Sequence, residues 1–182
     1  MIKAPDRSKE TLFQVAYQNQ VNLIQIADNK ANMIISINTM IISSIIAITG
    51  YGAVSDKIEY GKASIIVPIT LIVLTCLVSV IFAVQAAKPK LVSTKNSIDP
   101  TEAKSSLMFF GRIARYTQEA YISQIENLLL SEKEIYRNMT MDLFNQGLIL
   151  KRKYFLLSYA YNVFMIGFIF SVLIFLAFLA FG

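Results

Sequence analysis

Three long stretches without a charged side chain constrain this chain more than any other feature of its sequence. No Lys, Arg, Asp or Glu occurs between Lys30 and Asp56, between Lys62 and Lys88, or after Lys153. Each stretch is longer than the roughly 20 residues that an α-helix needs to cross the core of a bilayer. The three transmembrane helices that we expect cover about residues 32–51, 64–86 and 156–180.

Composition supports a membrane protein and excludes most kinds of catalytic site. Charged residues make up 16% of the chain and hydrophobic residues 55%, whereas soluble domains carry about 25% charge. The chain has no histidine and a single cysteine, Cys76. These counts exclude a histidine base, a histidine metal ligand and an intramolecular disulfide. No glycine-rich phosphate loop occurs either, so we expect no catalytic residue, no metal site, no cofactor and no enzymatic activity.

The distribution of Lys and Arg predicts how the chain crosses the membrane. Residues 88–153 hold eleven basic side chains against seven acidic ones, residues 1–31 hold four basic side chains, and the loop 51–62 is balanced. Basic segments stay on the cytoplasmic side, so we expect a multi-pass protein with a cytoplasmic N-terminus and an external C-terminus. This topology accounts for the net charge of +5 without a nucleic-acid partner.

The expected fold is an all-α membrane protein with three transmembrane helices, helical cytoplasmic extensions and a small cytoplasmic helical region. Thr117 and the capping box Ser131–Glu134 predict two helix starts, the second leading without a breaker into the last span. The expected segments are an N-terminal cytoplasmic helix (1–31), the first span (32–51), an external loop (52–63), the second span (64–86), a cytoplasmic helical region (87–153) and the third span with the external C-terminus (154–182).

Amide side chains form a stripe on the first helix and continue into the first span. The stripe follows intervals of four and three residues and consists of Gln18, Asn22, Gln25, Asn29 and Asn32. It is either a solvated face or a face that packs against another helix or a polar ligand. A buried amide within a span needs a partner, so it faces a neighbouring helix or a pore. The candidates for pore or helix contacts are Asn32, Ser36, Asn38, Thr39 and Ser43.

Charged residues also gather where the helices enter the membrane. Asp28 and Lys30 precede the first span, and Lys153 precedes the third. One interpretation is interfacial anchoring, in which the lysines reach the lipid headgroups. The other is a polar site beneath the membrane, in which Asp28 accepts hydrogen bonds and a lysine contacts a phosphate.

Three short segments resemble motifs of the Pycsar membrane effectors. The segment QIADNKANMIISIN resembles the AD-x-KA motif that precedes their first span. SLMFFGRIARYTQEAYISQI is similar to their FFG segment and the tyrosine-containing helix that follows it. MDLFNQGLILKRKYFLLSYAY is similar to their DL-x-x-Q-G…L-x-x-KY entry into the last span. The motifs occur in the order of the family and together cover most of residues 10–165.

The resemblance implies a role in bacterial anti-phage defence at the inner membrane. In this family a partner cyclase makes cyclic CMP or cyclic UMP upon infection, and the effector impairs the membrane so that the cell stops growing or dies. The chain has no recognisable separate nucleotide-binding domain, so the ligand would bind its helical cytoplasmic part. The candidate ligand residues are Gln25, Asp28, Lys30, Phe109, Phe110, Arg112, Asp142, Gln146, Lys153 and Tyr154.

These candidates offer the groups that such a ligand needs. Cations would hold the phosphate, carboxylates would accept from the ribose hydroxyl, amides would contact the base and aromatic rings would stack on it. Three spans in one chain cannot enclose an aqueous hole, so we also expect a homo-oligomer in the bilayer. The alternative function is a constitutive subunit of a small channel or transporter, or a membrane scaffold for other proteins.

Overall fold

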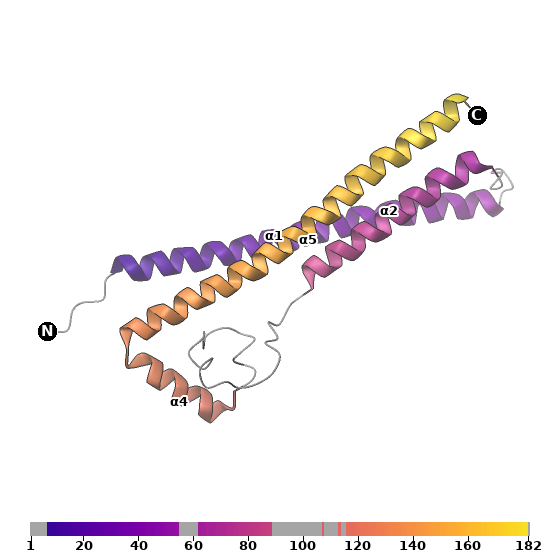
Figure 1. Cartoon of the computed structure of the whole chain (residues 1–182). Coiled ribbons are helices and arrows are strands. Elements are labelled where there is room, and N and C mark those ends of the chain that lie inside the picture. Colours follow the sequence, from indigo (N-terminus) through magenta and orange to yellow (C-terminus); the bar gives the residue numbers. More distant parts are fainter. Residues whose placement is uncertain (1–6, 55–61, 89–106, 108–112, 114–115, 182) are drawn as a thin grey trace. The chain divides into compact units, whose positions relative to one another are not determined.

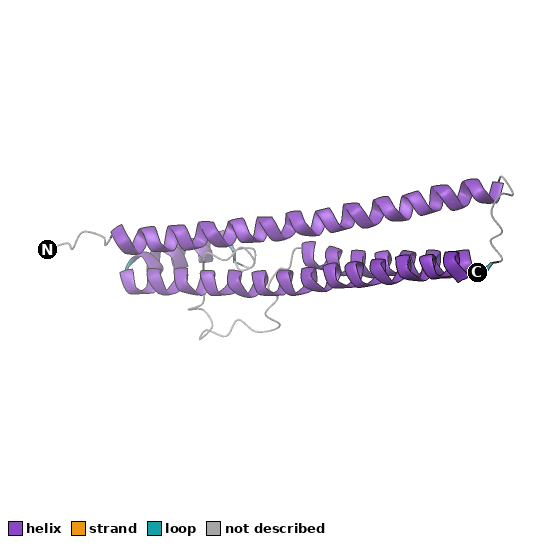
Figure 2. Cartoon of the chain, turned by 90° about the horizontal axis from the view of Figure 1, so that it is seen from above, coloured by secondary structure: helices purple, strands orange, loops and turns teal. Residues whose placement is uncertain are grey.

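The computed structural model describes residues 7–54, 62–88, 107, 113 and 116–181. Within these ranges all regular structure is helical, as Figure 2 shows. The helices are α1 (Arg7–Val54), α2 (Ala63–Ala87), α4 (Gln118–Leu129) and α5 (Glu132–Phe181), labelled in Figure 1. Three of them, α1, α2 and α5, are long and apolar enough to cross a membrane. The expected all-α fold class is therefore confirmed.

Two of the helices are much longer than a membrane is thick. α1 has 48 residues and α5 has 50, which corresponds to about 70–75 Å at 1.5 Å per residue. The hydrocarbon core of a bilayer measures only about 30 Å. Both helices therefore continue well beyond the membrane, whereas α2, with 25 residues, is close to the length of a single span.

Side-chain caps fix the starts of α4 and α5. The Thr117 hydroxyl accepts a hydrogen bond from the Ala120 N–H at 3.4 Å, and the Ser131 hydroxyl accepts one from the Glu134 N–H at 3.5 Å. Each cap satisfies a backbone donor that has no partner inside its helix. Both helix starts expected from the sequence are present.

The chain divides into two compact units. Residues 25–88 and 152–182 form the first, which we call the membrane unit, and residues 1–24 and 89–151 form the second, which we call the polar unit. The membrane unit contains the charge-free parts of α1, α2 and α5. The polar unit contains the N-terminal part of α1, all of α4 and the N-terminal part of α5.

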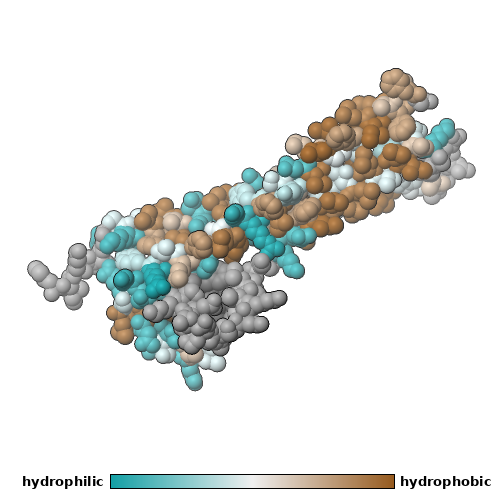
Figure 3. All heavy atoms as spheres, in the orientation of Figure 1, coloured by the Kyte–Doolittle hydropathy of each residue, from teal (hydrophilic) through white to brown (hydrophobic). Residues whose placement is uncertain are grey.

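The core of the membrane unit is built largely from small side chains. Ala31, Ala83 and Ala160 are fully buried, and Ile34 and Leu157 pack with them. Small residues let the backbones of membrane helices approach closely. This close packing favours helix association in a bilayer, where the hydrophobic effect does not drive it. Large apolar side chains cover the outside, and Figure 3 shows them gathered over α2 and the C-terminal half of α5.

The polar unit is held by an aromatic contact between α1 and α5 and by a side-chain hydrogen bond from α5 to the segment before α4. The Phe13 ring of α1 stacks on the Tyr136 ring of α5, with centroids 5.5 Å apart, and the Lys9 ammonium lies 5.9 Å from the Tyr136 centroid. The Asn138 side chain accepts a hydrogen bond from the Leu107 N–H at 3.0 Å. The ring contact joins α1 to α5, and the hydrogen bond holds Leu107 against α5 within the polar unit.

Candidate functional site

A chain of buried hydrogen bonds crosses the membrane unit from α1 through α2 to α5. The Asn38 amide donates to the Ile34 carbonyl at 2.7 Å and to the Ser79 hydroxyl at 3.1 Å. The Ser79 hydroxyl donates in turn to the Ala160 carbonyl at 2.9 Å. Asn38 and Ser79 are both fully buried. Of the alternatives for Asn38, a pore or a helix contact, the structure places it in a helix contact.

The other four candidates for pore or helix contacts lie apart from Asn38. Asn32, Ser36, Thr39 and Ser43 are all exposed on α1. The Thr39 hydroxyl donates to the carbonyl of Ile35, one turn earlier, at 2.8 Å. These four side chains therefore occupy an outer face of the membrane unit.

Two candidate ligand residues are paired with each other. The Lys153 ammonium of α5 donates to a carboxylate oxygen of Asp28 on α1, forming an ion pair. The Lys153 side chain is 11% exposed and the Asp28 side chain 39%. This contact joins the AD-x-KA segment to the segment that enters the last span, and it leaves little of Lys153 accessible to a ligand.

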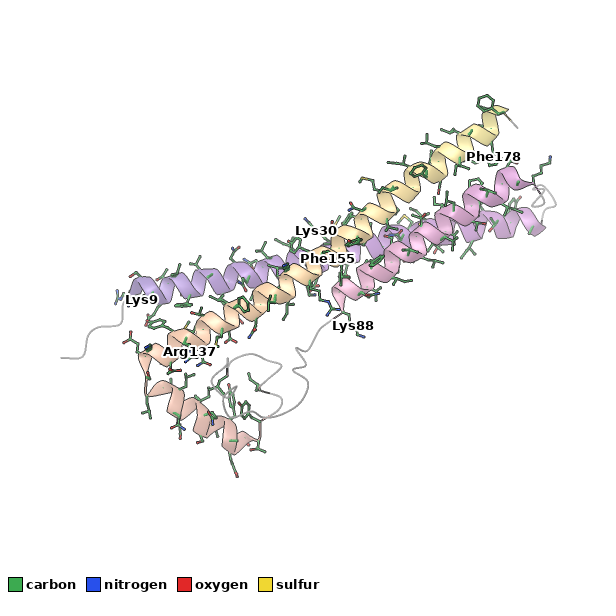
Figure 4. All side chains as sticks on the ribbon, in the orientation of Figure 1. Lys9, Lys30, Lys88, Arg137, Phe155 and Phe178 are labelled. Atoms are coloured by element: carbon green, nitrogen blue, oxygen red, sulfur yellow. The ribbon has the colours of Figure 1, made fainter. Side chains whose placement is uncertain are left out.

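A crevice in the membrane unit contains two further candidates. Lys30 and Tyr154 line it together with Leu157, Ser158 and Tyr161. The Tyr161 hydroxyl donates to the Lys30 carbonyl at 3.2 Å. Lys30, labelled in Figure 4, and Gln25 are both exposed on α1. The ammonium of Lys30 is thus accessible to a phosphate at the edge of the membrane segment.

Three buried oxygen atoms of the polar unit lack a hydrogen-bond donor within the described part of the chain. They are Oε1 of Gln20, Oδ1 of Asp142 and Oε1 of Gln146, and we call these three residues the acceptor cluster. Asp142 and Gln146 are one helical turn apart on α5, so they share a face. A Cβ atom built on Gly147 would lie 3.9 Å from the Gln20 amide nitrogen, which brings Gln20 close to this part of α5.

The acceptor cluster contains two residues of the DL-x-x-Q-G motif, Asp142 and Gln146, and adds Gln20 to the candidates. A buried oxygen atom without a hydrogen-bond donor lowers the stability of the protein. Three such oxygens therefore suit a ligand that supplies its own N–H or O–H donors. Gln20 lies off the amide stripe of α1, so the sequence pattern does not single it out. Nothing in the sequence indicates that this glutamine is half-buried whereas Gln18 is exposed.

The environment of Asp142 predicts a pH-dependent stability. Burial raises the pKa of its carboxyl group from 3.8 to about 6. Between about pH 4 and pH 6 the folded state retains a proton that the unfolded state releases, so the free energy of unfolding falls as the pH rises, by up to about 3 kcal/mol in all. Asp142→Asn should remove this dependence and stabilise the protein at pH 7.5. Thermal unfolding of the two proteins in detergent at pH 4 and at pH 7.5 measures this effect. The same pH dependence in Asp142→Asn as in the unchanged protein would contradict it.

Three further candidates, Phe109, Phe110 and Arg112, lie outside the described residues. The expected ligand residues that are described belong to both units. Asp142 and Gln146 belong to the polar unit, whereas Gln25, Asp28, Lys30, Lys153 and Tyr154 belong to the membrane unit.

Comparison with known proteins identifies the family. The family model for the Pycsar effector protein domain matches residues 12–181, which is almost the whole chain. No curated protein and no solved structure gives a significant match. The family is one of membrane effectors and is not a known family of enzymes. The resemblance found in the motifs is confirmed, and the chain belongs to the Pycsar effector proteins, which act at membranes in anti-phage defence.

Proposed function

We propose that this effector binds a cyclic pyrimidine mononucleotide, cyclic CMP or cyclic UMP, and responds by impairing the bacterial inner membrane. A cyclase in the same cell would supply the ligand. The polar unit would face the cytoplasm, together with the N-terminus, as the basic residues of the chain indicate. The outcome for an infected cell would be growth arrest or death.

The observation that carries the proposal is the acceptor cluster. Its three oxygens lack donors within the described part of the chain, and a cyclic pyrimidine mononucleotide brings donors of the right kind. Cytosine has an exocyclic amine, uracil has a ring N–H, and both nucleotides have a ribose 2′-hydroxyl. The amide nitrogens of Gln20 and Gln146 can donate to the carbonyl oxygens of the base. The cluster thus has the chemistry to hold a pyrimidine edge.

Binding in the polar unit can reach the membrane because α1 and α5 run through both units without a break. A ligand changes such an equilibrium only when it binds one arrangement of the helices more tightly than the other. An arrangement that brings α1 and α5 around the nucleotide would satisfy the acceptor cluster and alter the packing of the same helices further along. Several copies of the chain would act together, because three spans cannot enclose a water-filled path.

Leakage from liposomes tests this function. The purified full chain is reconstituted with an enclosed dye, and cyclic CMP, cyclic UMP or cyclic AMP is added. We expect rapid release with at least one of the pyrimidine nucleotides and none with cyclic AMP. No release with any nucleotide, in liposomes shown to contain the protein, would contradict the proposal. Release without a nucleotide would favour a constitutive channel instead.

Paired variants locate the response within the acceptor cluster. Gln20→Ala removes one of the three acceptors and should shift the nucleotide dose response about tenfold upward, as expected for one buried hydrogen bond. Asn19→Ala removes an exposed amide from the neighbouring position of α1 and should leave the response unchanged. Equal responses of the two variants would place the ligand elsewhere.

A further inference from the structure

The outer face of α1 carries an unbroken line of polar side chains through the membrane unit. Every member of the line is exposed, and consecutive members are alternately four and three residues apart. We call it the polar seam, and it consists of Gln25, Asn29, Asn32, Ser36, Thr39 and Ser43. In the sequence the amide stripe and the hydroxyls of the first span are two separate observations, and the single helix α1 makes them one face.

The polar seam lies on the side of α1 that faces away from its packing partners. Over the length of the seam, the residues of α1 buried in the membrane unit are Ala27, Ala31, Ile34 and Asn38. They repeat at intervals of four, three and four, half a helical turn away from the seam. Asn38, the remaining amide of the span, therefore forms its hydrogen bonds inside the membrane unit, whereas the amides of the seam point outward.

A lipid-facing position is unfavourable for the seam. Asn32 and the three hydroxyl residues that follow it lie in the charge-free stretch, where hydrocarbon offers no hydrogen bonds. Of the three hydroxyls, that of Thr39 already donates to the Ile35 carbonyl of its own helix. The Asn29 and Asn32 side chains have no hydrogen-bond partner within the described part of the chain. A shallow hollow opens on the same face and is lined by Asn29, Asn32, Met33, Ser36 and Ile37. This face of α1 thus combines amide groups that lack hydrogen-bond partners with a depression that can accept a side chain.

We propose that the polar seam is the interface at which α1 of a second copy of this chain packs, in parallel and in the same register. An amide group both donates and accepts, so a row of asparagines is complementary to an identical row. Copies inserted with the same topology are parallel, which places Asn32 opposite Asn32 at the same depth. Alternation of four and three residues is the spacing at which two helices keep contact along a left-handed supercoil.

This interface differs from an ordinary coiled coil in its chemistry. In water such a seam is apolar, and polar positions are exceptions that fix register. In a membrane an apolar seam has no advantage over lipid, whereas amides and small hydroxyl residues do hold helices together. The interface would serve the assembly proposed above, but it does not depend on a nucleotide, so its test stands apart from that of the function.

Disulfide cross-linking tests the interface in membranes. The full chain with Cys76→Ala, which removes the only cysteine, receives either Asn32→Cys in the seam or Ile48→Cys, an exposed position of α1 outside both the seam and the hollow. Oxidation without nucleotide should give a covalent dimer with Asn32→Cys and at least about tenfold less with Ile48→Cys. Equal cross-linking at both positions, or none at Asn32→Cys and at Ser36→Cys, would overturn the proposal.

A second measurement tests whether the amides hold the copies together. Asn29→Ala with Asn32→Ala should lower the dimer fraction reported by Ser36→Cys, with dimerisation about tenfold weaker, as expected for the loss of a few interhelical hydrogen bonds in a membrane. Both substitutions make α1 more apolar, so membrane insertion should be retained and is checked by fractionation. An unchanged dimer fraction would overturn the role given to the seam.

Discussion

Replacing Gly167 with alanine is expected to force α2 and α5 apart and to destabilise the membrane unit by about 3 kcal/mol, the upper part of the range for overpacking. A Cβ atom at this position would lie 2.2 Å from Thr75 Cγ2 and 2.8 Å from Thr75 Cβ. The Thr75 hydroxyl donates to the Leu71 carbonyl at 2.8 Å, which helps to hold the side chain in place. Relief therefore requires movement of a helix rather than rotation of one side chain.

Thermal unfolding in detergent measures this effect, and the chain supplies a matched control. Gly50 is also a helical glycine, but a Cβ atom there would meet nothing within 4 Å, so Gly50→Ala should not destabilise the protein. Combining Gly167→Ala with Thr75→Gly should recover part of the loss, because the clash is removed while the new glycine costs about 1 kcal/mol in a helix. An unchanged melting temperature for Gly167→Ala would mean that the two helices do not touch there.

The sequence predicted those parts of the fold that depend on neighbouring residues. A charge-free stretch identifies a candidate span because each residue in it meets the same apolar solvent. Thr117 and Ser131 identify helix starts because a cap bonds to a backbone group three residues away. The long helices followed from the absence of a breaker between such a cap and the span.

The sequence could not predict contacts between distant segments. Asn32 and Asn38 look alike in one apolar stretch, and only the position of Ser79, 41 residues after Asn38, separates the outer amide from the inner one. Gly167 gave no sign of its contact with Thr75, although a glycine within a span is typical of a close helix approach. The acceptor cluster also depends on a contact between distant segments, because Gln20 belongs to it only through its proximity to α5.

Breaking the ion pair between Asp28 and Lys153 is expected to destabilise the membrane unit more from one side than from the other. Asp28→Asn leaves the Lys153 ammonium, in a side chain only 11% exposed, without its carboxylate. Lys153→Met removes the buried charge and leaves the more accessible carboxylate, 39% exposed, in contact with water. We expect losses of about 2 kcal/mol for Asp28→Asn and about 1 kcal/mol or less for Lys153→Met.

Thermal unfolding in detergent again measures both losses, with Arg152→Met as the control. Arg152 precedes Lys153 and is exposed, so its removal changes the charge of α5 without breaking this pair. Equal losses for Asp28→Asn and Lys153→Met would show that the burial of Lys153 does not decide the energetics.

Exchange of the two charges separates a structural role from ligand contact. Asp28→Lys combined with Lys153→Asp restores an ion pair between α1 and α5 but reverses the charge at each position. If the pair serves to join the helices, the double variant should regain much of the lost stability and also the nucleotide-triggered leakage. If Asp28 or Lys153 contacts the nucleotide directly, the double variant should show no nucleotide-triggered leakage even where its stability returns. The exchange would place a carboxylate where Lys153 met the phosphate and an ammonium where Asp28 accepted a hydrogen bond. Because the ion pair leaves Lys153 so little exposed, we expect stability and leakage to return together.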